Sequence, residues 1–283
     1  MTGPTTEALA PPLVKAARRS LLSLALEGFR DIVQRQRLIR YLVGADLKRT
    51  HVDTLFGQLW WIFDPLLQMA VYYVLVSFIS TRQIPDYALF LFAAVLPWKW
   101  FATTVNDATM SVVNRQSLIR QIQFPKVVLP TAAVVAGTLS FMIGLIALGI
   151  VYLFFLDRLS PWVLLLPVVA AVQFVFTLAL AIALSACNAF YRDVQNVMRH
   201  IVRLWFYLSP GLYSLDHIGH GTARTILSLN PFAPLFESYR AITWGMGPPQ
   251  WLGLLWVLAL SVLLLILALA LFKRVEPAFA RIL

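Results

Sequence analysis

The chain has 283 residues, of which 60% are hydrophobic and only 13% are charged. A typical soluble domain has about 25% charged residues, so this composition excludes a soluble enzyme, a disordered protein and a fibrous repeat, and it predicts a multi-pass membrane protein. The formal net charge of +10 would suit nucleic-acid binding in a soluble protein. In a membrane protein Lys and Arg collect in cytoplasmic loops instead, so we expect no nucleic-acid partner.

The N-terminal region is expected to be a polar, flexible tail over residues 1–29, followed by a basic amphipathic helix over about 30–55. Within that helix Leu38, Tyr41, Leu42 and Ala45 recur at i, i+3, i+4 and i+7 with basic residues between them. This spacing is typical of an amphipathic helix. Immediately before a membrane span, such a helix can lie in the interface plane. An ordinary solvated helix is the alternative.

Six segments approach the roughly 20 apolar residues that a membrane-spanning helix needs. We expect spans at about 59–79, 87–113, 127–156, 162–187, 197–213 and 251–272. The fifth is short and carries Arg199 and Arg203, whereas the sixth is the most uniformly apolar. The predicted fold is an all-α membrane protein with six transmembrane helices.

The basic residues predict how these spans are oriented. Of the 23 lysines and arginines, 18 fall on the side of the two termini, four fall in the opposite loops, and Lys99 lies within the second span. Such an excess marks the cytoplasmic side. We therefore expect both termini in the cytoplasm.

The outer loop between spans five and six, at about 214–249, is long and partly apolar. It carries Phe232, Phe236, Tyr239 and Trp244, and Pro231 interrupts it. Proline disfavours a continuous helix, and non-helical backbone at membrane depth must be buried in protein or line a cavity. We expect one or two short re-entrant helices here that dip into the outer leaflet.

The sequence lacks the motifs of an ATPase or a metalloenzyme. No Gly-x4-Gly-Lys-Ser/Thr phosphate loop and no His-Glu-x-x-His motif occurs. His217 and His220 are three residues apart, but a lone pair in a loop is more often polar surface than a metal site. The acids Asp64 and Asp107 lie in different spans. We therefore predict a chain without catalytic, cofactor-binding or metal-binding residues.

Charged residues inside spans have two interpretations. Lys99, close to Pro97, could face a wet channel or an anionic ligand, or it could snorkel along a broken helix. The residues alone leave both open. Arg199 and Arg203 are four apart and share one helical face. They could line an inner vestibule, although the interfacial end of span five is favoured.

The 9 Trp, 9 Tyr and 19 Phe gather mainly at predicted span ends. An aromatic belt that anchors the protein at both membrane interfaces accounts for most of them. The alternative is a surface on which sugar rings stack along a conduit. For any single residue the belt is favoured.

Several motifs in this order resemble those of ABC-2 type permease subunits that export O-antigens, teichoic acids and related lipid-linked polysaccharides. The resemblance covers about 30–283, and Asp64 departs from the glutamine that many relatives carry before the proline of span one. The motifs are the segments 57–67 (GQLWWIFDPLL), 96–98 (LPW), 114–120 (NRQSLIR), 124–130 (FPKVVLP), 191–194 (YRDV), 208–210 (LSP) and 229–232 (LNPF).

The resemblance implies a homodimer in the cytoplasmic (inner) membrane whose copies dock two cytoplasmic ABC ATPase subunits. ATP and Mg would be bound by those partners, and this chain would be a transport subunit rather than an enzyme. The segment 114–126 would carry a short coupling helix, and 191–194 would form a second cytoplasmic turn. The expected ATPase-coupling residues are Arg115, Leu118, Arg120, Phe124, Pro125, Lys126, Arg192 and Asp193.

The implied substrate is a hydrophilic glycan on a polyprenyl pyrophosphate that remains partly in the membrane lipid. Basic residues near the inner mouth would attract the pyrophosphate, and aromatic rings would offer the glycan weak contacts that do not stall it. The expected inner-mouth residues are Arg37, Arg40, Lys48, Arg49 and Arg203. The expected channel aromatics are Trp60, Trp61, Trp98, Trp100, Phe101, Trp205 and Tyr207.

Three other functions are weighed against this one. An ABC-2 exporter of a small lipid or drug has similar spans. A secondary transporter needs ionisable residues near the midplane in repeat-related segments, for which only Lys99 qualifies. A membrane glycosyltransferase needs acidic residues that meet at one interface, and the sequence does not assemble them.

Overall fold

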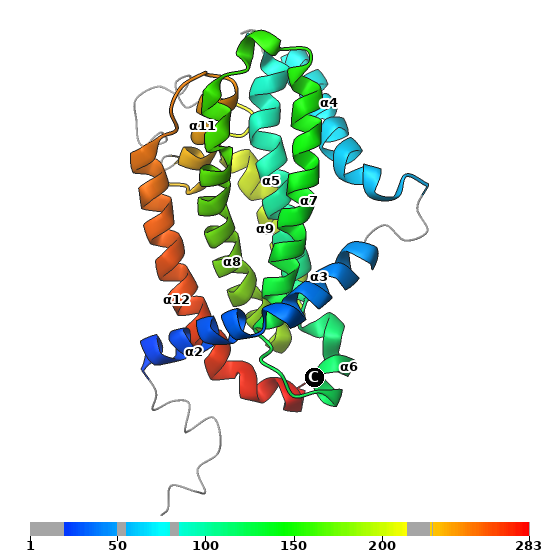
Figure 1. The fold of residues 1–283 in the computed structure, drawn as a ribbon, viewed down its shortest axis with the longest axis vertical. Coiled ribbons are helices and arrows are strands. Elements are labelled where there is room, and N and C mark those ends of the chain that lie inside the picture. The colour runs from blue at the N-terminus through cyan, green and yellow to red at the C-terminus, as the bar shows by residue number, and fades with distance from the viewer. Residues whose placement is uncertain (1–19, 50–54, 80–84, 214–226, 228, 283) are drawn as a thin grey trace, which may run out of the picture.

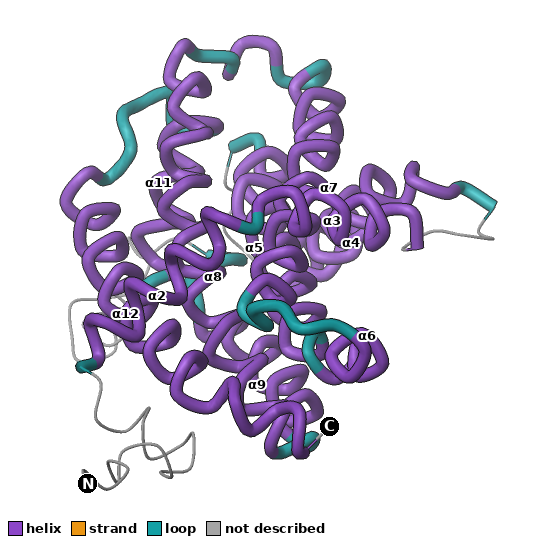
Figure 2. Tube along the Cα trace, turned by 60° about the horizontal axis from the view of Figure 1, so that its bottom comes forward, coloured by secondary structure: helices purple, strands orange, loops and turns teal. Residues whose placement is uncertain are grey.

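The computed structural model describes residues 20–49, 55–79, 85–213, 227 and 229–282. Within these residues the chain contains only helices and loops (Figure 2). The α-helices are α2 (Leu21–Gln34), α3 (Gln36–Arg49), α4 (Trp60–Ile79), α5 (Tyr87–Met110), α6 (Gln116–Gln121), α7 (Val128–Tyr152), α8 (Leu166–Phe190), α9 (Val194–Leu208), α11 (Phe232–Thr243) and α12 (Trp251–Ile282). Short 3-10 turns precede α4, α6 and α8, at Gly57–Leu59, Val113–Arg115 and Pro161–Leu165.

Five helical segments in the described residues are long and apolar enough to cross a membrane. They are Gly57–Phe78, Tyr87–Met110, Val128–Tyr152, Pro161–Phe190 and Trp251–Phe279. They agree closely with the predicted first, second, third, fourth and sixth spans. The predicted fifth span corresponds to α9, which has only 15 residues, or about 22 Å of helix. That is shorter than the roughly 30 Å hydrocarbon core, and α9 is not among the five.

The N-terminal helix begins earlier than expected. Ser20 caps α2, because its side chain accepts a hydrogen bond from the Ser23 backbone N–H at 3.2 Å. The predicted tail over 1–29 is therefore wrong for 21–29, which is helical. A break at Arg35 separates α2 from α3, so the single helix expected over about 30–55 is two helices.

The two N-terminal helices run across one end of the bundle (Figure 1). Leu24, Ala25 and Gly28 of α2 are buried, and α2 packs against α12, whereas α3 packs against α7. The α3 residues that are buried are Ile39, Leu42 and Val43. Tyr41, which the periodicity placed on the apolar face, is 75% exposed. The end of the bundle with α2, α3 and α6 is called the α6 end below.

The helices enclose two hydrophobic clusters. One is rich in aromatic residues, includes Trp98, Phe101, Phe206 and Phe232, and joins α5, α9 and α11. The other lies where α3, α7, α8 and α12 meet and includes Phe272 and Phe279 of α12. Helix α5 contributes to both clusters, and most of its residues are buried. It is therefore the central helix around which the others pack.

Candidate functional site

A cavity of about 690 Å³ lies along one face of α5. Its walls come from α3, α4, α5, α7, the turn before α6, and α9. It extends from Asn114 and Gln195 at the α6 end to Lys99, near the middle of α5. We call this space the α5 cavity. It is a candidate ligand site because volumes of 300–1,000 Å³ are typical of small-molecule pockets.

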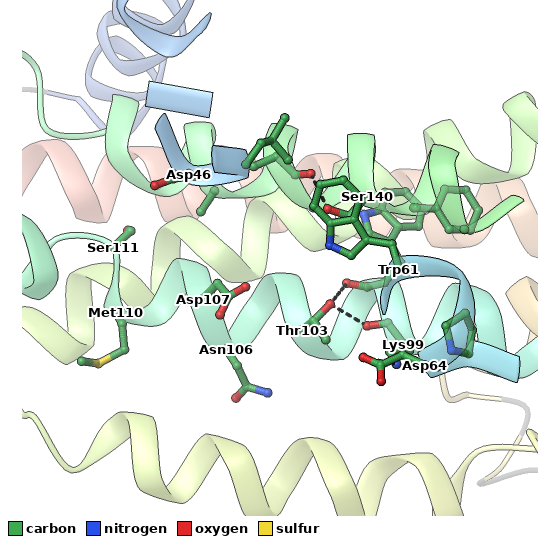
Figure 3. Close-up of a pocket in the computed structure, with 18 of the residues that line it drawn as sticks. Asp46, Trp61, Asp64, Lys99, Thr103, Asn106, Asp107, Met110, Ser111 and Ser140 are labelled. Atoms are coloured by element: carbon green, nitrogen blue, oxygen red, sulfur yellow. Dashed lines mark hydrogen bonds and ion pairs between the residues drawn. The ribbon is translucent and has the colours of Figure 1, made fainter. Parts of the chain in front are cut away.

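The floor of the α5 cavity is a polar stripe on α5. Lys99, Thr103, Asn106, Asp107 and Met110 line it, as Figure 3 shows. The spacing i, i+4, i+7, i+8 and i+11 places these residues on one helical face. Lys99 and Asp107 stand out individually in the sequence, but the stripe that they share was not predicted. The signal was present in the 3.6-residue spacing of polar residues within an apolar span.

Lys99 and Asp64 form an ion pair across the cavity. The Lys99 Nζ lies 3.0 Å from the Asp64 Oδ2, and the two side chains are 23% and 49% exposed. Figure 3 shows them together at one end of the stripe. A charge at membrane depth is tolerated when it has a partner or faces a polar cavity. Lys99 has both, so the structure favours the cavity-facing interpretation over simple snorkelling.

The opposite wall of the cavity consists mainly of small residues of α7, including Ala133, Gly137 and Gly144. Gly137 is required by close helix approach, because a Cβ there would lie 2.0 Å from the Thr104 Oγ1. The small residues let α5 and α7 pack closely beside a cavity that larger side chains would fill. Aromatic rings complete the lining: Trp61 of α4, and Trp100 stacked on Phe141 at 4.5 Å.

The cavity lining carries no net formal charge. It contains three carboxylates and three cations, and two pairs are made: Lys99 with Asp64, and Arg115 with Asp46 of α3. Arg199 of α9 is the third cation and Asp107 the third acid. Such a lining is polar but has no excess positive charge.

The expected ATPase-coupling residues lie at the α6 end. Leu118 and Arg120 are on α6, and Phe124 and Pro125 lie in the segment that leads into α7. Arg192 and Asp193 are exposed at the start of α9. Two contacts tie the coupling segment to the bundle: Arg115 pairs with Asp46, and the Lys126 backbone N–H donates to the Glu276 carboxylate.

Glu276 belongs to a cluster of ion pairs at the same end. Lys273 lies 2.7 Å from Asp31 of α2, 2.8 Å from Glu276 and 3.4 Å from Glu27. Its side chain is only 11% exposed. The cluster therefore joins α2, the end of α12 and the coupling segment. The sequence did not predict this cluster, because Asp31 and Lys273 are 242 positions apart.

The expected inner-mouth residues whose side chains the structure describes do not line the cavity. Arg37, Arg40 and Lys48 are exposed on α3, and Arg203 is exposed on α9. The side chain of Arg49 lies outside the described residues.

The structure separates the expected channel aromatics into three groups. Trp61 and Trp100 line the α5 cavity. Trp98 and Phe101 are 4% and 0% exposed inside the aromatic cluster, where Trp205 packs against them. These rings pack inside the bundle, and their role as channel aromatics stays a prediction. The remaining two, Trp60 and Tyr207, are partly and half exposed.

The motifs around 208–210 and 229–232 meet at the other end of the bundle. Asn230 accepts a hydrogen bond from the Trp205 indole N–H at 3.1 Å and donates to the Ser209 hydroxyl at 2.8 Å. Arg240 of α11 is 5% exposed and donates to the carbonyl oxygens of Pro210 and Gly211. These contacts hold irregular backbone next to α11. Asn230 and Arg240 therefore stabilise this part of the fold.

Among the described residues no group of three His, Cys, Asp or Glu side chains could hold a metal ion. His217 and His220 lie outside the described residues.

Comparisons with known proteins indicate one family. Residues 37–244 match the family described as ABC-2 type transporter, a range that includes every wall of the α5 cavity. An O-antigen export system permease protein RfbA of Myxococcus xanthus is 35% identical over 256 residues, 89% of this chain and 97% of that protein. Two proteins of the same name from Klebsiella pneumoniae are 29% identical over 248 and 250 residues, covering 87% of this chain and 95% of each relative.

Proposed function

We propose that this chain, which belongs to the ABC-2 type transporter family, is the permease subunit of an ATP-driven exporter of polyprenyl-pyrophosphate-linked polysaccharide. The observation that carries the proposal is the 35% identity to an O-antigen export permease over 97% of that protein. Membership of the family excludes the secondary transporter and the glycosyltransferase considered above. The alternative is an exporter of a small lipid or drug, and the ATP hydrolysis experiment described below distinguishes the two functions.

The proposed assembly is a homodimer with two cytoplasmic ABC ATPase subunits that bind ATP and Mg. The coupling surface would be α6 with the turn at Arg192 and Asp193, because both lie at the α6 end and are exposed there. Movement of α6 would be transmitted to α3 through the Arg115–Asp46 pair and to α12 through the Lys126–Glu276 contact. Movement of the six-residue helix α6 would thereby shift both α3 and α12.

The proposed location is the cytoplasmic (inner) membrane, with both termini and the α6 end in the cytoplasm. The excess of basic residues on this side supports that orientation. Helix α8 ends at the α6 end and α12 begins at the opposite end (Figure 1). The intervening chain must therefore cross the bundle, which favours α9 as part of a sixth crossing and α11 as a short re-entrant helix.

Recruitment of the anchor is proposed to rest on surface cations rather than on the cavity. Arg37 and Arg40 of α3 are exposed on a helix that lies across the α6 end. Guanidinium groups bind phosphate oxygens in a bidentate manner. Replacing both residues by Glu should lower export of the glycan in cells, whereas Arg30→Glu, an exposed charge reversal on α2, should lower it less. Unaltered export in the double variant would disprove this recruitment role.

The deciding experiment measures ATP hydrolysis by the partner ATPase in lipid nanodiscs, with and without this chain. Polyprenyl-pyrophosphate-linked oligosaccharide and a hydrophobic drug are added in separate arms. We expect a stable complex whose rate changes with the glycolipid and not with the drug. A response to the drug alone would indicate a small-molecule exporter, and failure to bind any ABC ATPase would disprove the proposed assembly.

A matched pair of variants tests the coupling surface. Arg120→Glu on α6 should weaken association with the ATPase. Arg30→Glu on α2 reverses an exposed charge at the same end and should leave the complex intact. Equal complex formation by the two variants would place the coupling surface elsewhere.

A further inference from the structure

A short turn joins α8 to α9 at the α6 end. Only Tyr191, Arg192 and Asp193 separate Phe190, the last residue of α8, from Val194, the first residue of α9. The side chains of all three turn residues are exposed. Such a turn keeps two helix ends close together, but the angle between the helices is set by the side chains that pack between them.

The start of α9 is capped by a residue of α8 rather than by its own N-cap residue. An N-cap side chain usually accepts from an N–H of the first helical turn, and its own backbone is then extended. Asp193 instead has φ −71° and ψ −19°, and its side chain makes no capping hydrogen bond. The Oδ1 of Asn188 accepts a hydrogen bond from the Gln195 backbone N–H at 3.1 Å. Asn188 therefore supplies the cap that Asp193 does not.

The nitrogen of the same amide contacts α5. The Asn188 Nδ2 donates to the Met110 Sδ at 3.4 Å, and Asn188 is 0% exposed. Met110 is the last residue of α5. It lines the α5 cavity beside Ser111, at the end of the polar stripe opposite Lys99 (Figure 3). One buried side chain thus joins α8 to the first turn of α9 and to the end of α5.

Helix α9 continues from this cap into the wall of the cavity. Gln195 and Arg199 both line the cavity, and their spacing of four residues places them on one helical face. A change in the angle of α9 therefore moves part of the cavity wall together with the exposed turn. Breaking the hydrogen bonds of a buried amide is unfavourable. Asn188 therefore links the position of the turn to the shape of the cavity.

We propose that Asn188 is a positioning residue for transport, which holds the start of α9 against α5 so that movement of the turn at 191–193 changes the α5 cavity. The proposal rests on the proposed function, because an ATPase must move this turn. Since Asn188 is 0% exposed, it acts through α9 and touches neither the ATPase nor the substrate. Without its amide the turn still docks the ATPase, but α9 moves independently of α5, and ATP is hydrolysed with less export.

The test compares three variants at two buried positions of α8. Asn188→Leu keeps the branching of the side chain and removes both hydrogen-bonding groups. Asn188→Asp keeps an oxygen for the Gln195 N–H and removes the donor to Met110. Ser185→Ala is the matched control, because Ser185 is also 0% exposed and its hydroxyl shares a hydrogen bond with that of Ser111 at 3.2 Å. The control removes a contact between α8 and the end of α5 and leaves the cap of α9 in place.

The first measurement is amide hydrogen exchange of the whole chain in nanodiscs, which needs no ATPase. With Asn188→Leu, exchange in the first turn of α9 should rise about three- to tenfold, because one hydrogen bond is lost. Asn188→Asp and Ser185→Ala should leave that exchange within about twofold of the wild type. Equal exchange in all four proteins would show that Asn188 does not hold the start of α9, and it would overturn the inference.

The second measurement is the number of ATP molecules hydrolysed for each lipid-linked glycan exported by the complex in proteoliposomes. Asn188→Leu should raise this ratio about three- to tenfold, with association of the ATPase unchanged. Asn188→Asp should restore the wild-type ratio, and Ser185→Ala should not alter it. A purely structural role would lower the amount of folded complex and leave the ratio of the folded fraction unchanged.

Three results would overturn the inference while the proposed function stands. They are an unchanged ratio with Asn188→Leu, an equal rise with Ser185→Ala, and an Asn188→Asp variant as impaired as Asn188→Leu. If the wild-type complex exports no glycan, the proposed function itself fails and the inference fails with it. If Asn188→Leu elutes as an aggregate in size exclusion, Asn188→Ser, with its smaller side chain, replaces it and carries the same expectation.

Discussion

The two faces of α5 differ far more than the average composition of the helix indicates. On one face Trp98, Phe101 and Val105 are at most 4% exposed and pack in the aromatic cluster. On the other face Lys99 and Thr103 line a polar cavity. Trp98 and Lys99 are adjacent in the chain, yet they serve opposite roles because successive helical residues point about 100° apart.

The difference shows how one helix can be both a rigid core element and a cavity wall. Ring contacts on the aromatic face, such as Trp98 to Phe232 at 4.7 Å between centroids, fix the position of α5 against α9 and α11. The opposite face presents polar groups to the cavity. A site built on a helix held in this way is better defined than one built on loops.

The largest expected effect comes from removing the ring at the centre of the aromatic face. Phe232 is fully buried and contacts Trp98, Phe101 and Trp205. Phe232→Ala should lower the free energy of unfolding by about 3–5 kcal/mol, measured by thermal unfolding in detergent. Tyr207→Ala, at a ring that is 50% exposed, should change it by less than about 1 kcal/mol. Similar losses for both would show that the aromatic cluster is not a packing core.

A smaller effect is expected where the cavity face meets α7. Gly137→Ala places a methyl group against Thr104 and must separate α5 from α7, so it should destabilise the protein by about 1–3 kcal/mol. Gly149→Ala, in the same helix with no atom within 4 Å of the added Cβ, should be neutral or stabilising by up to about 1 kcal/mol. Equal melting temperatures for the two variants would contradict the close approach.

The Lys99–Asp64 pair should contribute less than about 1 kcal/mol, since the Asp64 side chain is 49% exposed to the cavity. A double-mutant cycle with Lys99→Met and Asp64→Asn measures this coupling. A second cycle that pairs Lys99→Met with Asp107→Asn is the control and should give weaker coupling. Coupling of several kcal/mol in the first cycle would mean that the pair is buried rather than exposed to the cavity.

The smallest effect is expected for Thr103→Cys, a substitution that tests whether the cavity is accessible to a reagent. It should change the free energy of unfolding by no more than about 0.5 kcal/mol. In a Cys187→Ser background, Thr103→Cys should react with a thiol reagent supplied from the α6 end. Val105→Cys, at a position that is 0% exposed, should stay unmodified. Labelling of both positions, or of neither, would remove the distinction between the two faces.

Apolar run length was sufficient to predict most of the long helices. Span two was expected at 87–113 and α5 covers Tyr87–Met110, because a continuous apolar stretch must be helical in a membrane. The sixth span was expected at about 251–272, and α12, which contains it, continues to Ile282. The polar residues there resemble the start of a loop. They remain helical because Lys273 pairs with Asp31 of α2 and with Glu276.

The candidate site was only partly predictable. The order of the motifs indicated the family, and Lys99 and Asp64 were noted, but nothing in their separate spans showed that they meet at 3.0 Å. The aromatic residues were the least predictable. Trp98 and Trp100 share one short motif, yet only Trp100 lines the cavity.

The sequence by itself determined the membrane environment, the helical class and the approximate limits of the long helices. These follow from local composition, since each span must satisfy its own backbone and supply its own apolar length. Only the tertiary structure decided which face of α5 is core and which is cavity, and that Asp31, Lys273 and the coupling segment form one cluster. Such contacts join helices that are distant in the chain, and the partner of each helical face is set by packing rather than by the residues of that face.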